Sequence, residues 1–242
     1  MTCINNPIPW ELWVMIANFS DECDYNLFFT NKKFFSLINH YKFDSNVIEF
    51  AVKQGNLDII KYILKLKHEK NNLIGSKRFG KVGSQQCFFM SCEQGHLEIV
   101  KFLVKGETLL FFCAQQNKND IQTDYNYAMQ LASGKGHLEV VKLLVEKGAD
   151  VQDGYNWAVQ CASQKGHLEV VKFLIEQGAN IQADNNLAVK LASGNGHFEV
   201  VKFLVEKGAN IQTENNLAVK LASENGHLEV VKFLVEQGAD IR

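Results

Sequence analysis

Five histidines occupy the same position in a repeated stretch of sequence, GH[LF]E[VI]V, and histidine can bind a metal or move a proton near neutral pH. Zinc ligands must all lie within about 2.1 Å of one ion, whereas neighbouring helical units lie roughly 8–10 Å apart. One histidine per unit therefore cannot form a shared metal site. We expect hydrogen bonds that tie the turn between two helices, and Asn56 in the first copy suits that role. The five are His96, His137, His167, His197 and His227.

The other reactive residues also lack a recognisable site. The six cysteines have no C-x-x-C spacing, which is typical of reduced thiols and not of a disulfide frame or zinc site. The glycines and lysines of residues 74–83, IGSKRFGKVG, do not fit a phosphate-binding loop. There is no nucleophile elbow and no H-E-x-x-H motif. The sequence predicts no metal, no cofactor and no enzymatic activity.

The composition indicates a globular protein without an obvious charged partner. The 242 residues are 46% hydrophobic, and the formal net charge is −2. Arginine, the usual side chain for reading bases and phosphates, occurs only as Arg78 and Arg242, so we expect no nucleic acid. The sequence has no apolar run long enough for a bilayer and no signal-peptide pattern. We expect a cytoplasmic protein that does not engage membranes.

The repeated sequence predicts the helices that position these residues. Gly136, Gly166, Gly196 and Gly226 are spaced by 30 residues, and the two earlier spacings are 40 and 41. Each unit reads as a short helix such as LAVKLAS, with Lys190 on an exposed edge, followed by a second helix such as FEVVKFLVE. Gly196 and Gly208 should end the two helices with positive φ. The second helix has one narrow polar stripe, so a unit can bury its apolar faces only by stacking on its neighbours.

These residues resemble the ankyrin repeat. The stretch LAVKLASGNGHFEVVKFLVEKGA matches the family pattern T-P-L-H-x-A-A-x-x-G-H-x-x-V-V-x-x-L-L-x-x-G-A, with LAVK in place of T-P-L-H and a unit shorter than the usual 33 residues. This abbreviated style is similar to ankyrin proteins of giant DNA viruses, which would place the chain in the host cytoplasm.

The resemblance implies an all-α solenoid of stacked helix-turn-helix units and a small helical N-terminal segment, residues 1–43. The extra residues near 66–86 and 106–121 form longer outer helices or extended fingers. The predicted units cover about residues 44–74, 84–112, 122–151, 152–181, 182–211 and 212–242.

Variation among the last four copies marks a candidate binding surface. The second helix hardly varies, whereas the first helix and its turn do, and ankyrin-family proteins bind partners on the concave face that these elements line. Tyr and Trp are common interface anchors. Tyr127 and Trp157 either anchor a partner or fill the core, whereas we expect Tyr125, Tyr155, Gln130 and Gln160 to be exposed. The candidate residues, centred on the third and fourth units, are Tyr125, Tyr127, Gln130, Tyr155, Trp157, Gln160, Lys190 and Lys220.

The N-terminal segment lies outside the repeat pattern and has two interpretations. Residues 8–39, IPWELWVMIANFSDECDYNLFFTNKKFFSLIN, resemble an F-box, which recruits the Skp linker subunit of cullin–RING ubiquitin ligases. The chain would then be a substrate adaptor. Alternatively, the segment only caps the array, and the chain is a plain binding module. If the F-box resemblance holds, the residues that meet the linker subunit are Pro9, Leu12, Ile16 and Leu27.

The last unit shows no polar cap after Gly238. Val230, Val231 and Leu234 match positions that should be buried in the other units. We expect either a frayed terminal unit or self-association that covers this edge.

Overall fold

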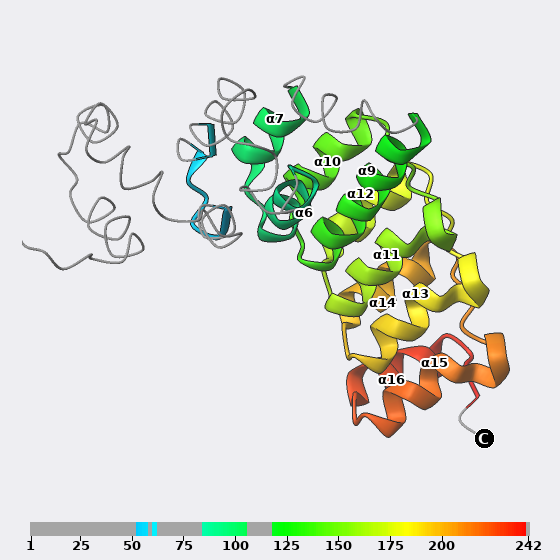
Figure 1. The fold of residues 1–242 in the computed structure, drawn as a ribbon. Coiled ribbons are helices and arrows are strands. Elements are labelled where there is room, and N and C mark those ends of the chain that lie inside the picture. The colour runs from blue at the N-terminus through cyan, green and yellow to red at the C-terminus, as the bar shows by residue number, and fades with distance from the viewer. Residues whose placement is uncertain (1–51, 58–59, 62–83, 106–117, 241–242) are drawn as a thin grey trace, which may run out of the picture. The chain divides into compact units, whose positions relative to one another are not determined.

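A computed structural model describes residues 52–57, 60–61, 84–105 and 118–240 of the chain (Figure 1). The chain divides into two units, residues 1–44 and 45–242, and all of the described residues belong to the second. Pro9, Leu12, Ile16 and Leu27 therefore lie outside the described residues, and so do residues 66–83 of the first insertion.

All regular elements among the described residues are α-helices, and from residue 84 onward they come in pairs. None of these helices has the length and apolar character that a membrane crossing requires. The first helices of the pairs are α6 (Ser84–Gln94), α9 (Lys118–Gly134), α11 (Asp153–Lys165), α13 (Ala183–Gly194) and α15 (Thr213–Glu224). The second helices are α7 (Leu97–Lys105), α10 (Leu138–Glu146), α12 (Leu168–Glu176), α14 (Phe198–Glu206) and α16 (Leu228–Glu236).

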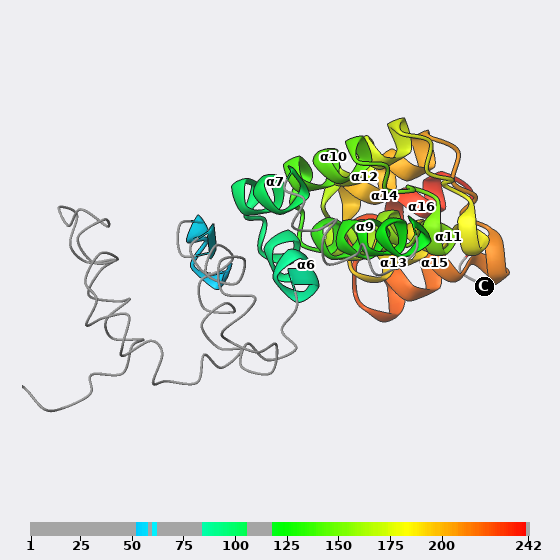
Figure 2. The ribbon, with the colours of Figure 1, turned by 45° about the horizontal axis from the view of Figure 1, so that its top comes forward.

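The helices form two layers. The first helices lie side by side in one layer and the second helices in the other (Figure 2), and each helix also packs against the partner in its own pair. Consecutive pairs are therefore stacked in a row, as the prediction of an all-α repeat solenoid requires. The fold class is confirmed for this part of the chain.

The second helices show why stacking is needed. On α14, Glu199, Lys202 and Glu206 are exposed, while the opposite side is buried against α13 and the neighbouring units. Each fully buried apolar side chain contributes about 1.5–3 kcal/mol of burial free energy. One leucine at an equivalent position in each of the five described helix pairs is almost completely inaccessible: Leu103, Leu144, Leu174, Leu204 and Leu234.

Both helices of a unit end as the glycines predict. Gly196 has φ +75°, and the bonds from Gly196 N to Ser193 O and from His197 N to Ala192 O close the end of α13. Gly208 has φ +95° and closes α14 by the same pattern. In this motif the left-handed residue satisfies the last carbonyls of a helix, and glycine adopts it without a Cβ penalty.

The backbone conformation at the start of the first helix differs between units. In α11, Gly154, Tyr155 and Asn156 all have left-handed dihedrals, with φ of 57°, 58° and 66°. Equivalent left-handed turns begin α13 and α15. In contrast, α9 continues as a right-handed helix through these positions back to Lys118. The end of the insertion at residues 106–121 thus belongs to a longer helix.

The last unit bears on two expectations, a frayed terminal unit and an edge covered by self-association. The frayed unit is wrong, because α16 has the same length as its counterparts. Val230 and Leu234 are buried, whereas Val231 is partly exposed although its counterpart Val201 is fully buried. Leu228 and Val235 are exposed as well. Self-association at this edge stays a prediction.

Candidate functional site

Three large aromatic side chains are exposed on the first-helix layer. Tyr127 is 47% exposed, Trp157 is 54% exposed and Tyr155 is 79% exposed. Of the alternatives for Tyr127 and Trp157, the structure therefore shows the exposed one and not the core position. Together with Phe89 of α6, these residues form what we name the aromatic strip, across three consecutive units: Phe89, Tyr127, Tyr155 and Trp157.

Contacts within the array hold two of these rings in place. The Phe89 and Tyr127 rings meet edge to face with centroids 4.9 Å apart, an arrangement that adds to simple burial. Trp157 lies over Gly154, where an added Cβ would come within 3.2 Å of the indole Cε3 atom. Rings fixed before a partner arrives lose less conformational entropy on binding.

The two tyrosines at equivalent repeat positions point to different surroundings. Tyr125 lies in the continuous right-handed helix α9 and turns its ring onto Phe88, at a centroid distance of 5.9 Å, so it is only partly exposed. Tyr155 lies in the left-handed turn of α11 and projects outward. The hand of the backbone, which the sequence did not predict, thus decides which tyrosine faces solvent.

The polar candidate residues are less accessible than predicted. Gln130 and Lys220 are partly buried, and Gln130 Nε2 lies 3.5 Å from an Asp153 carboxylate oxygen. Gln160 is buried and donates from Nε2 to the Tyr155 carbonyl at 2.8 Å. The expectation that Gln160 is exposed is therefore wrong, because this helix position faces the adjoining turn.

Lys190 also requires a correction, since it is only 3% exposed and not on an open edge. Its ammonium lies 2.9 Å from the carboxylate of Glu214 in the turn of the following unit. Glu214 also accepts from Asn185 Nδ2 at 3.2 Å. The hydrogen bond from Lys190, and then its positive charge, lower the pKa of Glu214. A buried lysine needs such a partner.

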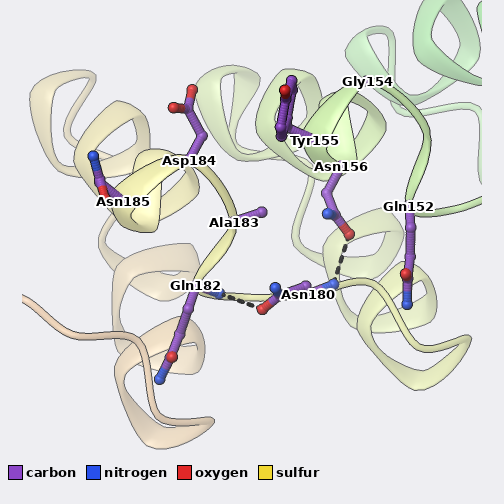
Figure 3. A pocket seen from close by; sticks show the side chains of 9 residues that line it. All are labelled: Gln152, Gly154, Tyr155, Asn156, Asn180, Gln182, Ala183, Asp184 and Asn185. Carbon is purple, nitrogen blue, oxygen red and sulfur yellow. Dashed lines mark hydrogen bonds between the residues drawn. The ribbon is translucent and has the colours of Figure 1, made fainter.

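A polar hollow lies between the left-handed turns of α11 and α13 (Figure 3). In Figure 3, Tyr155 and Asp184 project to the same side of the two turns, on either side of the hollow. The sequence did not predict this hollow, because the left-handed backbone of the two turns could not be predicted from it. Its lining residues are Gln152, Gly154, Tyr155, Asn156, Asn180, Gln182, Ala183, Asp184 and Asn185.

Hydrogen bonds between successive turns support the hollow. Asn156 Oδ1 accepts from the Asn180 backbone N–H at 2.6 Å, and Gln152 Nε2 donates to the Gly178 carbonyl at 2.8 Å. The same pair of bonds recurs at Asn186 and Gln182 in the next unit. We name this side of the array the turn edge. The recurring Q-x-x-x-N spacing was the signal in the sequence that could have revealed it.

Four of the five repeated histidines, His137, His167, His197 and His227, form hydrogen bonds as predicted, but to a different partner, whereas His96 Nε2 is buried with no partner among the described residues. His167 Nε2 lies 3.2 Å from the Gly134 carbonyl of the preceding unit, and His197 Nε2 lies 2.9 Å from the Gln164 carbonyl. A carbonyl only accepts, so the ring carries its proton on Nε2. Burial lowers the pKa of His167. These rings tie units together along what we name the histidine edge. In the described part of the chain, no three metal-ligating side chains form a group.

Comparisons with known proteins find one family. The family model for ankyrin repeats in three copies matches residues 48–153, 88–185 and 181–242. The ankyrin repeat proteins R844, R880 and L45 of Acanthamoeba polyphaga mimivirus are 37%, 37% and 42% identical to the chain over 133, 127 and 97 residues. The alignments cover 55%, 52% and 40% of the chain. They span 56%, 46% and 42% of the relatives' own lengths.

Proposed function

Because the chain belongs to the family of ankyrin repeat proteins, we propose that it is an interaction scaffold that binds a protein partner on its aromatic strip. Ankyrin repeats are generally protein–protein interaction modules, and the members of this family are typically binding scaffolds, not enzymes. The mimivirus relatives support expression inside an infected host cell, where we place the protein in the cytoplasm.

The observation that carries this proposal is the position of the exposed aromatics. Tyr127, Tyr155 and Trp157 are three of the five large hydrophobic side chains exposed in the described residues, and all three lie on the first-helix layer. The other two are Leu228 and Val235 of α16. Tyr and Trp are enriched at interface hot spots, whereas leucine and valine are under-represented there. The aromatic strip is therefore the better candidate for the interface.

Affinity purification with matched variants tests the proposal. The full chain and its Tyr127→Ala/Trp157→Ala variant are used to capture proteins from an Acanthamoeba polyphaga lysate, and the captured proteins are quantified by mass spectrometry. A Leu228→Ala/Val235→Ala variant removes similarly exposed apolar side chains elsewhere. A partner retained by the chain and by this control, but lost from the aromatic variant, supports the proposal. Equal capture by all three proteins rejects it.

A more specific form of this function is a substrate adaptor for a cullin–RING ubiquitin ligase. Its support is the F-box resemblance of residues 8–39, in which Pro9, Leu12, Ile16 and Leu27 would meet the Skp linker subunit. Under this proposal the array holds the target, and the N-terminal segment recruits the ligase.

A direct binding assay separates the adaptor from a module whose N-terminus only caps the array. The purified Skp subunit is titrated against the full chain and against a Leu12→Asp/Ile16→Asp variant. Saturable binding that the variant loses favours the adaptor. The absence of binding to the full chain favours the plain module and leaves the interaction scaffold itself unaffected.

A further inference from the structure

We propose that the hollow between the turns of α11 and α13 holds a lysine or arginine side chain of the protein partner. This inference rests on the proposed function, because it names the chemistry of the partner at one end of the aromatic strip. Three features of the structure support it: an unpaired carboxylate, an exposed aromatic ring and an internal lysine that performs the same role one unit further along the array.

The carboxylate belongs to Asp184, which lines the hollow and is exposed. Among the described residues it makes no hydrogen bond and no ion pair, and no lysine, arginine or histidine lines the hollow. A carboxylate without a basic neighbour favours a cation in this part of the surface.

The neighbouring unit shows what such a carboxylate binds. Glu214 is the repeat counterpart of Asp184, and it accepts a hydrogen bond from Lys190 Nζ at 2.9 Å. The counterpart of Lys190 one unit earlier is Gln160, which is neutral and donates to the Tyr155 carbonyl instead. At Asp184 the array thus keeps the carboxylate but lacks the ammonium. A basic side chain from a partner would restore the missing charge.

The hollow contains an aromatic ring, that of Tyr155, as well as the carboxylate of Asp184. It is 79% exposed and lies across the hollow from Asp184 (Figure 3). The face of a tyrosine ring attracts an ammonium or guanidinium group. The counterpart of Tyr155 in the next unit is Asn185, which instead helps to bind Glu214. In the described turns, an aromatic face and a carboxylate without a partner therefore coincide only where the internal lysine is missing.

A peptide-display selection on the full chain tests the inference. A random library of linear peptides is selected, and the Kd of the best peptide is measured against the chain and four variants: Asp184→Asn, Tyr155→Ala, Trp157→Ala and Glu199→Gln. We expect lysine or arginine to be enriched at one peptide position. Asp184→Asn keeps the shape of the side chain and suits the left-handed backbone; it should raise the Kd about fivefold at low salt. Tyr155→Ala should have an effect of similar size.

The controls separate this inference from the proposed function. Glu199→Gln removes one exposed carboxylate from the other layer and should leave the Kd unchanged. If the selected peptides depend on Trp157 but carry no basic residue, or if Asp184→Asn has no effect, the hollow does not hold a basic side chain, and binding by the aromatic strip is unaffected. If no peptide is enriched, or none depends on the strip, both ideas are rejected.

Discussion

The histidine edge and the turn edge of the array both link consecutive units, but they do so with different side chains. Both join each unit to the next through hydrogen bonds to backbone groups. Along the histidine edge the last four units repeat almost letter for letter, whereas along the turn edge the sequence changes from unit to unit.

The difference in sequence variation follows from how much space each edge leaves for a different side chain. On the histidine edge, each ring lies directly over a glycine of the preceding unit: a Cβ on Gly136 would come within 2.6 Å of His167 Nδ1. The glycine therefore has no room for a side chain while the histidine is present. On the turn edge, the linking Gln and Asn contact backbone atoms, so the side chains between them are free to differ. Close packing thus fixes one edge, and loose packing leaves the other available for recognition.

The largest expected effect comes from filling the space under a histidine. Gly136→Ala places a Cβ in a left-handed backbone, at about 1–2 kcal/mol, and against the His167 ring, at about another 1–3 kcal/mol. Gly178→Ala is the matched control, because Gly178 has φ +95° with nothing within 4 Å and should show the backbone cost alone. Urea unfolding measures both changes. Equal losses would mean that the ring does not constrain Gly136.

A double-mutant cycle sharpens the same contact. His167→Ala removes the hydrogen bond to the Gly134 carbonyl, which should lower the free energy of unfolding by about 1–2 kcal/mol. It also clears the space above Gly136, so Gly136→Ala should cost less in the His167→Ala background than in the parent chain. Additive losses in the four proteins would contradict direct contact between the two residues.

On the turn edge, one substitution should stabilise the protein. Tyr155 has φ 58°, a conformation that tyrosine rarely adopts and asparagine tolerates. Asparagine stands at the equivalent positions 185 and 215 with the same backbone hand. Tyr155→Asn should therefore raise the free energy of unfolding by about 0.5–1 kcal/mol, as measured in urea. A loss of stability would mean that the exposed ring of Tyr155 stabilises the fold and does not serve binding alone.

The smallest effect is the pH dependence of the histidine edge. Burial holds the pKa of His167 below its ordinary value of 6.5, so the unfolded chain takes up the proton first as the pH falls. This contribution to stability is intact above pH 6.5 and declines as the pH falls through the pKa of the folded protein. The urea midpoint should therefore drop slightly between pH 7.5 and 5.5, and less so in His167→Ala. An identical drop in the variant would contradict this origin.

The polar stripe and the glycine positions within one unit predicted most of the repeated helices and turns. The narrow polar stripe of residues 198–206 indicated a helix buried on its other sides, and the glycines at 196 and 208 indicated its neighbouring turns; both predictions are confirmed. The burial of Lys190 could not be predicted within one unit, because its partner Glu214 belongs to the next. The acceptors of His167 and His197 likewise lie in the preceding unit.

The left-handed turns escaped prediction for a different reason. Asparagine and glycine tolerate positive φ, but three consecutive such residues that include Tyr155 or Glu214 contradict local preference and depend on the array around them. One signal was present in the copies themselves: Lys190 occurs with Glu214, and Gln160 occurs with Asp184. The binding roles of the surface residues and of the N-terminal segment remain predictions.

The histidine edge is fixed by packing, whereas the aromatic strip is available for binding. An affinity measurement on the captured partner tests this division most directly. Isothermal titration of the full chain, Trp157→Ala and Leu228→Ala compares two exposed apolar side chains, 54% and 64% accessible, on different layers. We predict that Trp157→Ala raises the Kd at least about tenfold, as loss of a hot-spot residue does, while Leu228→Ala leaves it unchanged. An unchanged Kd for Trp157→Ala, or an equal rise for Leu228→Ala, would contradict this account.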